Sequence, residues 1–197
     1  KQTGGIYAFK LHAKYANDYM NYVMPPESTV QPIDNHYRQQ ELYVTLSNLF
    51  SFTKWWSVNL SADAQWNRLD AQGSESFNMH FVKPRRYTLL GAAATSLTFR
   101  HFSVQASALY TFVHDVSARG FPVAGNKSIL TPTLIASYSP WKKAGLEFRA
   151  YYKKIFRMPT FNDHYYVQLG SRLRKQEYTT QYNIGAAYKK QYGKGFL

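Results

Sequence analysis

Cysteine is absent from the 197 residues, and so is any long hydrophobic run. Without cysteine the chain can form no disulfide scaffold, no zinc site with sulfur ligands and no thiol nucleophile. No stretch approaches the roughly 20 consecutive apolar residues that a membrane-spanning helix requires. If this protein crosses a membrane, it must therefore cross it as β-strands.

Acidic residues are scarce: 11 Asp and Glu stand against 24 Lys and Arg, which gives a formal net charge of +13. A strongly basic chain often binds nucleic acid. Here the cations do not run in blocks but gather at strand ends and in polar segments, for example at Lys83, Arg85 and Arg86. We expect no nucleic-acid partner. Lipopolysaccharide phosphates, an anionic ligand in a lumen, or the uneven charge of one piece of a longer protein would each account for the imbalance.

Motifs for catalysis are missing as well. The sequence has no Gly-rich phosphate loop, no nucleophile elbow and no metal-binding helix motif, and its six His are not spaced as a metal pair. His114, Asp115 and Ser117 lie close together, but neighbouring residues of a strand point to opposite faces, which places this trio poorly for a proton relay. We expect no enzyme, no cofactor and no metal site.

The clearest positive signal is strict alternation over the twelve residues from Trp56 to Asn67. An amphipathic helix would instead repeat its apolar positions every three or four residues. A membrane-barrel strand needs roughly 9–11 residues, more than most strands of soluble proteins have. We predict an apolar exterior and a polar opposite face. The exterior residues are Trp56, Val58, Leu60 and Trp66, and the opposite ones are Asn59, Asp63 and Gln65.

The same alternation recurs along the chain. It predicts strands near 7–15, 102–112, 146–153 and 178–188, and weaker ones near 40–51, 86–99 and 128–139. Tight turns are expected near 52–55, 100–101 and 140–145, and long loops at 16–39, 69–85, 114–127 and 155–176. Short turns at one end, long loops at the other and rings near the strand ends are typical of outer-membrane barrels. We therefore predict an all-β fold, an antiparallel up-and-down meander of about eight long strands that is a segment of a transmembrane β-barrel.

Two segments carry a family resemblance. Residues Ile155–Tyr166 read IFRMPTFNDHYY, and residues Glu177–Gly185 read EYTTQYNIG. This pattern resembles the strand–loop–strand signature of TonB-dependent outer-membrane receptors, in particular siderophore- or cobalamin-receptor-like proteins of the Bacteroides type. Segments Ile33–Val44 and Phe52–Asn67 look like barrel strands of the same group. Where that family usually has Leu-x-Pro-Glu before the next strand, this chain departs from it and has Arg174, Lys175, Gln176 and Glu177.

The resemblance implies that residues 1–197 are the central part of a larger barrel of about 22 strands, without the plug and without the TonB-contacting segment. It implies a bacterial outer-membrane receptor that takes up a scarce ligand such as a ferric siderophore or cobalamin. Outer-membrane lipid, lipopolysaccharide and TonB are the expected partners. The candidate residues for contact with a ligand or with the plug gather at one loop mouth: Arg157, Asn162, Asp163, His164, Tyr165 and Tyr166.

Two alternatives stay open. One is a small self-contained outer-membrane barrel that serves as an anchor or adhesin, and the other is a soluble β-sandwich that binds carbohydrate. For a barrel segment we expect all tight turns at one rim, all long loops at the other, and an open sheet without a ladder between 7–15 and 178–188. Basic side chains are expected to face the lumen and to favour an anionic cargo: Lys10, His12, Lys14, Arg149 and Lys153.

Overall fold

The structure, a computed structural model, describes residues 6–26, 32–117, 123, 126–141, 145–165 and 175–189. Its eight strands form one antiparallel sheet in chain order. They are β1 (Ile6–Met24), β2 (Ile33–Ser51), β3 (Trp56–Gln72), β4 (Pro84–Phe99), β5 (Phe102–Ser117), β6 (Lys127–Tyr138), β7 (Leu146–Arg157) and β8 (Glu177–Tyr188). The predicted up-and-down meander is confirmed. Two short helices, α1 (Glu75–His80) and α2 (Phe161–Tyr165), follow β3 and β7.

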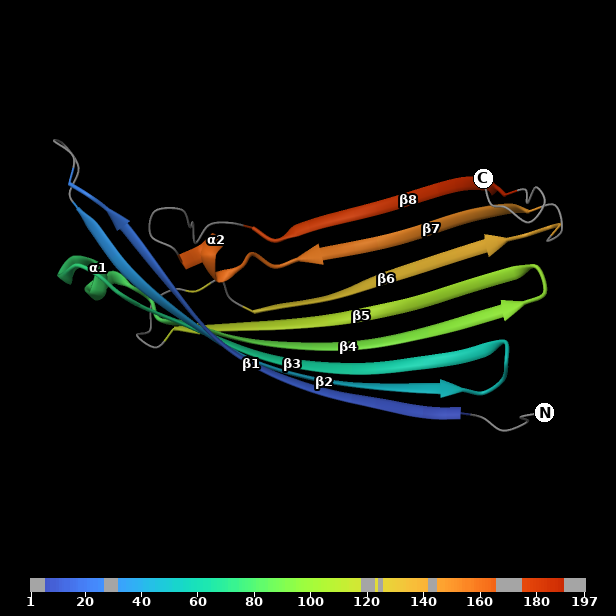
Figure 1. Ribbon diagram of the computed structural model, residues 1–197, viewed down its shortest axis with the longest axis horizontal. Helices are drawn as coiled ribbons and strands as arrows, with labels where there is room; N and C mark the ends of the chain where they lie inside the picture. The colour runs from blue at the N-terminus through green and yellow to red at the C-terminus, as the bar shows by residue number, and fades with distance from the viewer. Residues whose placement is uncertain are drawn as a thin grey trace, which may run out of the picture.

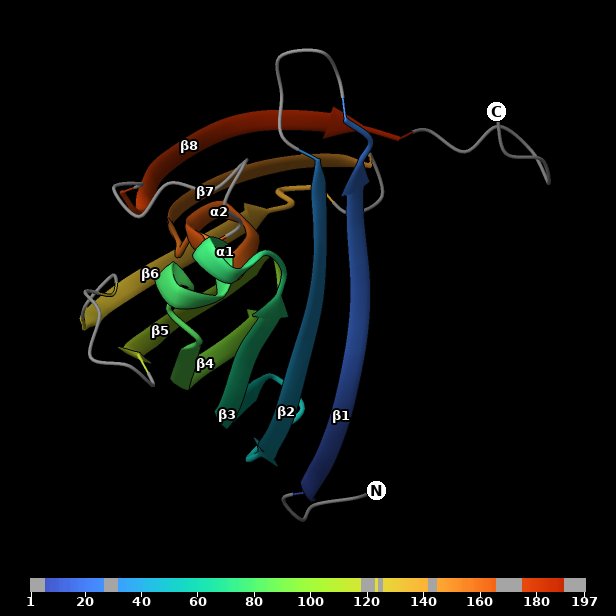
Figure 2. The same ribbon diagram turned by 90° about the vertical axis from the view of Figure 1, so that its left-hand side faces the viewer.

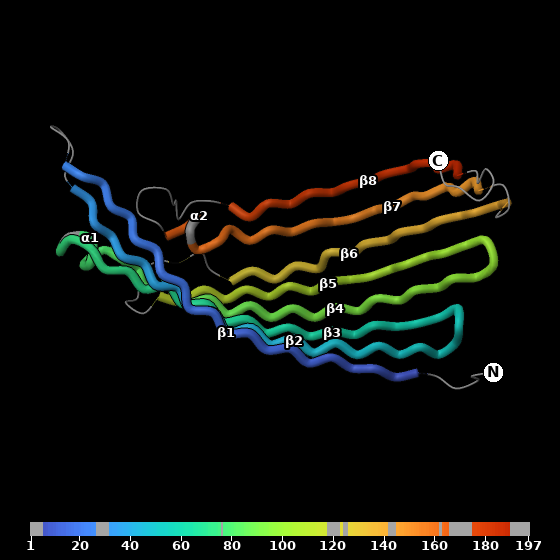
Figure 3. Tube along the Cα trace, in the orientation of Figure 1, coloured from blue at the N-terminus to red at the C-terminus, as the bar shows by residue number. Residues whose placement is uncertain are grey.

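The two ends of the sheet differ as predicted. Strands β2, β4 and β6 end at one end of the sheet, which we call the turn end, and strands β1, β3, β5 and β7 end at the opposite end, the loop end (Figures 1 and 3). The connecting residues 27–31, 118–122, 124–125, 142–144 and 166–174, which include the predicted tips near 27, 120 and 142, lie outside the described residues. Both helices lie at the loop end (Figure 1). No helix of the described residues is long and apolar enough to cross a membrane.

Several strands run further toward the loop end than the sequence predicted. The expected loop at 16–39 is wrong over most of its length, because β1 and β2 stay paired up to Met24 and Ile33. Cross-strand hydrogen bonds between polar side chains support this extension: Arg38 Nε donates to Asn17 Oδ1 at 2.9 Å, and His36 Nδ1 lies 2.9 Å from Asn21 Oδ1. Backbone pairing needs no apolar face, so the end of the apolar pattern did not mark the end of the strand.

Paired residues of neighbouring strands point to the same side of a sheet, so the register identifies the two faces. One row across all eight strands is apolar apart from a threonine: Tyr7, Phe50, Val58, Thr95, Ala106, Leu134, Tyr152 and Tyr182. A row of the opposite face is mostly polar: Ser51, Ser57, Ser96, Gln105, Ile135, Tyr151 and Asn183. The prediction for β3 is confirmed, since Trp56, Val58, Leu60 and Trp66 share the apolar face and Asn59, Asp63 and Gln65 share the other.

The sheet curves into an arc, and both helices lie on its concave side (Figure 2). Buried apolar side chains from the polar-leaning face and from the helical segments form one cluster there: Tyr37, Leu69, Ala71, Phe81, Val82, Phe161 and Tyr165. The polar-leaning face is therefore the inner face of the arc, and the apolar face is the outer one. Large apolar side chains of the outer face remain exposed, for example Leu89 (53%) and Leu130 (57%).

The sheet is open. Within the part of the chain that the structure describes, β1 pairs only with β2 and β8 only with β7, so the predicted absence of a ladder between the first and last strands is confirmed. At the turn end, Gly145 (φ +71°) fixes how β7 meets β8. A Cβ at Gly145 would overlap the carbonyl oxygen of Lys189, whose N–H donates to the Gly145 carbonyl at 2.9 Å. Only glycine fits both this φ and this approach.

Candidate functional site

The helical segments 73–83 and 158–165, which we call the cap, lie on the inner face at the loop end (Figure 2). The start of α2 is set by a reciprocal pair of side chains. Asp163 Oδ2 accepts hydrogen bonds from the backbone N–H and the hydroxyl of Thr160, both at 2.9 Å, and the Asp163 N–H donates to Thr160 Oγ1 at 3.3 Å. This is the logic of a capping box, written here as Thr160-Phe-Asn-Asp163.

The start of α1 is held by similar local bonds. Ser74 Oγ accepts from the Phe77 N–H at 3.3 Å. The Asn78 amide bonds both backbone groups of Gly73, at 3.0 and 2.9 Å. The Phe77 ring then packs edge-on against Tyr37 of β2 with a centroid separation of 6.1 Å. These contacts attach the first helical segment to the sheet wall.

A buried ion pair ties the second helical segment to the wall. Arg86 of β4 and Asp115 of β5 are direct cross-strand partners on the inner face. Arg86 donates to both carboxylate oxygens of Asp115, at 2.6 and 2.7 Å, and the Asp115 side chain is fully buried. The remaining Arg86 nitrogen, Nη1, donates to the carbonyl of Pro159 at 2.6 Å, and the guanidinium lies 5.1 Å from the Phe161 ring centroid. Arg86 therefore binds Asp115 on the wall with two nitrogens and the Pro159 carbonyl with the third. The Tyr165 hydroxyl donates to Asp115 Oδ2 at 3.4 Å, so the ion pair links α2 to the wall.

A cavity of about 370 Å3 lies between the cap and the inner wall. Its polar lining includes Gln39, Glu41, Gln65, Asn67, Arg86, Thr88 and Thr111, and its apolar lining includes Leu90, Leu109, Val113, Phe156, Met158 and Phe161. Polar groups that converge beside apolar side chains are the usual composition of a small-molecule site. We call this hollow the inner pocket.

Glu41 organises the polar side of the inner pocket. Its Oε1 lies 3.2 Å from Lys14 Nζ, and its Oε2 accepts hydrogen bonds from Gln65 Nε2 at 3.0 Å and Asn67 Nδ2 at 3.1 Å. The carboxylate is therefore satisfied by its own neighbours. Gln65 and Asn67 also carry amide oxygens, which are hydrogen-bond acceptors.

The predicted site residues do not form one patch. Asp163 caps α2, while His164 and Tyr165 are buried at 2% and 5% exposure. Arg157 is exposed at the end of β7 and lies 3.5 Å from Glu177 of β8. Asn162 belongs to α2, with its side chain outside the described residues, and Tyr166 and Arg174 lie outside them entirely.

Sequence reasoning missed Arg86, Glu41 and Asn67. The one signal available was charge at inner-face positions of strands, which becomes informative only when the register makes Arg86 and Asp115 partners. The structure also separates the trio at the end of β5: His114 contacts Asn126, Asp115 holds Arg86, and Ser117 Oγ donates to the Val82 carbonyl at 2.9 Å. This confirms that the trio is not arranged as a relay. The described residues include no group of three His, Asp or Glu side chains that would hold a metal ion.

The expected basic side chains lie at inner-face positions, but two of them are paired with acids. Lys14 lies 3.2 Å from Glu41, and Arg149 lies 2.7 Å from Glu147. Lys10, His12 and Lys153 occupy inner-face positions by register. Because such pairs cancel at a distance, the inner wall presents a weaker positive field than the net charge of the chain suggests.

No protein-family model matches the sequence, and no curated protein does. Among solved structures, the chain is similar to copper transporter OprC, with a TM-score of 0.66 at 13% identity. This chain folds as part of an outer-membrane β-barrel wall. The match covers 94% of this chain and 33% of the neighbour, so the chain spans about a third of that transporter's length. The barrel wall, with its long strands and apolar outer face, belongs in the bacterial outer membrane.

Proposed function

We propose that this chain forms part of the wall of a TonB-dependent outer-membrane transporter that imports a scarce small ligand. The observation that carries the proposal is the inner pocket, a polar-lined hollow roofed by the cap on the lumen side of a lipid-facing wall. The segment with the receptor-like signature, residues 155–166, includes α2. The fold neighbour is named as a transporter, which agrees with transport rather than catalysis.

In this proposal the ligand enters from the loop end and meets the cap before it reaches the open lumen. The ion pair of Arg86 and Asp115 holds α2 against the wall, so the cap narrows the passage without a covalent link. Energy for release comes through a plug and TonB, which act outside this chain. The wall supplies a fixed surface along which the ligand moves.

The ligand class follows from the inner pocket more than from net charge. The amides of Gln39, Gln65 and Asn67 and the hydroxyls of Thr88 and Thr111 suit a polar molecule with donors and acceptors. Arg157, exposed at the loop end, is the member of the predicted patch that we propose for direct contact. Copper is what the neighbour's name states for that protein, and the likeness lends no support to the expected siderophore or cobalamin.

The two alternatives fit less well. A self-contained small barrel would close β1 onto β8, whereas these strands are the two open edges of the sheet. A soluble sandwich would bury one face of each sheet against a second sheet. Here the described strands form a single sheet whose outer apolar residues, such as Leu60, are left exposed.

The test is uptake by cells that express the intact protein, with and without TonB. The probes are copper(II), a ferric catecholate siderophore and cyanocobalamin, each quantified in washed cells by mass spectrometry. We expect uptake of at least one probe that requires both the intact protein and TonB. Uptake that is equal in cells with and without TonB, or no protein-dependent uptake of any probe, would contradict the proposal. Arg157→Gln should raise the concentration for half-maximal uptake. Lys154→Gln, three residues earlier on β7, is the matched control.

A further inference from the structure

The connections at the turn end carry positive charge and no acid. Residues 52–55, 98–103 and 139–145 contain Lys54, Arg100, Lys142 and Lys143 and neither Asp nor Glu. The connections at the loop end, in contrast, include acids beside cations, for example Glu75, Asp163 and Lys83. Lys142 and Lys143 lie outside the described residues, so the argument uses Lys54 and Arg100.

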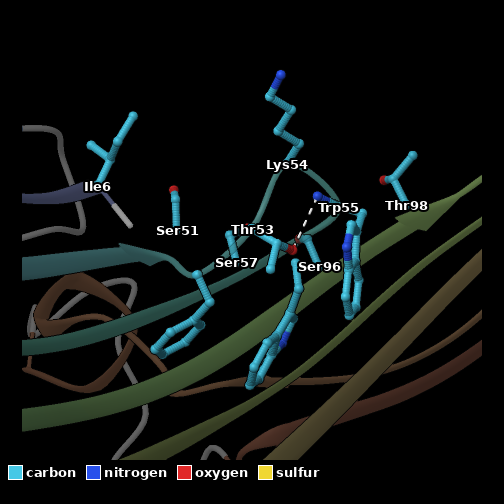
Figure 4. A pocket seen from close by; sticks show the side chains of 10 residues that line it. Ile6, Ser51, Thr53, Lys54, Trp55, Ser57, Ser96 and Thr98 are labelled. Carbon is cyan, nitrogen blue, oxygen red and sulfur yellow. Dashed lines mark hydrogen bonds between the residues drawn. The ribbon is translucent and has the colours of Figure 1, made fainter. Parts of the chain in front are cut away.

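The adjacent connections at the turn end form one continuous surface, because backbone hydrogen bonds join them side by side. The Thr98 N–H donates to the Trp55 carbonyl at 2.8 Å, which links the end of β4 to the turn between β2 and β3. The Ser139 N–H donates to the His101 carbonyl at 2.8 Å, which links the next turn to the end of β6. Lys54 and Arg100 therefore lie on neighbouring turns that hydrogen bonds join into one rim. Figure 4 shows Lys54 extending away from the strand ends, with the Trp55 ring on the side of Thr98.

Aromatic rings cover the wall at the height of this rim. Phe52 stacks on Trp56 with centroids 4.5 Å apart, and Phe102 stacks on Tyr138 at 4.4 Å. The Arg100 guanidinium lies 5.3 Å from the Phe99 ring centroid. Trp55 and Trp141 are 47% and 65% exposed. Such rings settle at the level of lipid headgroups, so the two cations lie at the height of the phosphates.

We propose that the turn end binds the phosphate groups of anionic phospholipids in the periplasmic leaflet, with Lys54 and Arg100 as the cationic contacts. Short turns of outer-membrane barrels face the periplasm, which selects this leaflet. Complementary charge favours an anionic over a zwitterionic headgroup. Glu147, which lies just inside β7, does not oppose this because it is paired with Arg149 on the inner face at 2.7 Å. The inference goes beyond transport and holds for any cargo.

The test is native mass spectrometry of the intact protein in a neutral detergent, with dioleoyl phosphatidylglycerol or dioleoyl phosphatidylcholine added. We expect the phosphatidylglycerol to bind more tightly, and the preference to fall about fivefold for each of Lys54→Gln and Arg100→Gln. Added salt should weaken the preference as well, because both contacts are exposed. The matched control is the Lys83→Gln, Lys175→Gln double variant, which removes the same charge from the loop end.

Three results would overturn the inference: equal binding of the two lipids by the unchanged protein, an unchanged preference in the Lys54→Gln, Arg100→Gln double variant, or an equal loss in the loop-end control. Folding is checked by the shift in gel mobility on heating. If the double variant fails to fold, the single variant Lys54→Gln decides, because Lys54 is exposed at the tip of its turn.

Discussion

The two ends of this wall are built from the same strands but stabilised differently. At the loop end, the cap buries a cluster of apolar side chains and a bidentate ion pair against the inner face. At the turn end, rings and cations stay exposed, and backbone hydrogen bonds between adjacent turns fix the rim. The first end has a small core of its own, whereas the second has its apolar side chains arranged for a lipid surface.

This difference teaches where the wall can tolerate change. A substitution at the loop end removes packing or leaves a charge buried, and both are costly in a filled interior. A substitution on the outer face or at the rim exchanges one lipid or water contact for another. Its cost is low unless the backbone conformation itself requires the residue.

The largest effect is expected at the buried ion pair. Asp115→Ala leaves the Arg86 guanidinium buried at the cap without its carboxylate, and breaking such a pair costs about 3–5 kcal/mol of unfolding free energy. Urea unfolding of the intact protein in detergent micelles measures the loss, and limited proteolysis should show earlier cleavage within 158–165. The control is Arg157→Ala, which breaks an exposed pair with Glu177 and should cost about 0–1 kcal/mol. Equal losses of unfolding free energy for the two variants would contradict a special stabilising role for the buried ion pair.

A somewhat smaller loss of unfolding free energy is expected for substitutions in the apolar cluster beneath the cap. Leu69 of β3 is fully buried, so Leu69→Ala should lower the unfolding free energy by about 2–5 kcal/mol through lost burial and the cavity left behind. Leu60→Ala removes the same atoms from the same strand, but at an outer position that is 44% exposed, and should cost clearly less. The same urea titration compares the two. A larger loss for Leu60 would mean that the faces are assigned the wrong way round.

How much of this was predictable depends on which end is considered. The strict alternation of Trp56–Asn67 predicted a strand and both of its faces, because successive side chains of a β-strand point to opposite faces. The tight turns followed from the same pattern. Along β1 the alternation breaks down beyond Tyr15, because both faces there carry polar and apolar residues. Pairing that rests on Asn17 and Arg38 leaves no period of two in the sequence.

The candidate site was predictable only in part. The segment that forms α2 stood out by its sequence, and Thr160 with Asp163 is a readable helix start. Its inward fold depends on Arg86 and Asp115, which are 29 residues apart in sequence and meet only through the register of β4 and β5. No local pattern contains that information. For the same reason, burial of His164 and Tyr165 in the cap was not foreseen.

A third contrast lies within the turn end itself. Gly145→Ala should lower the unfolding free energy by about 1–2 kcal/mol, because a side chain at φ +71° is strained and its Cβ overlaps the Lys189 carbonyl. Gly91→Ala, on the outer face of β4 with open space around its Cβ, should change stability little. Urea unfolding of both variants measures the difference. If the two variants lost the same unfolding free energy, a specific requirement for glycine at position 145 would be contradicted.

The central claim, a wall with lipid on one face and a polar lumen on the other, is tested most directly by single-cysteine scanning of residues 57–65. Residues 1–197 contain no cysteine, so each introduced thiol is the only spin-labelling site within them, and any cysteine elsewhere in the intact protein is replaced by serine first. In the intact protein in bilayers, we expect collision rates with oxygen to be high at 58, 60, 62 and 64, and those with a water-soluble nickel complex to be high at 57, 59, 61, 63 and 65. Equal accessibility at 60 and 61, or a repeat of three to four residues, would contradict the account.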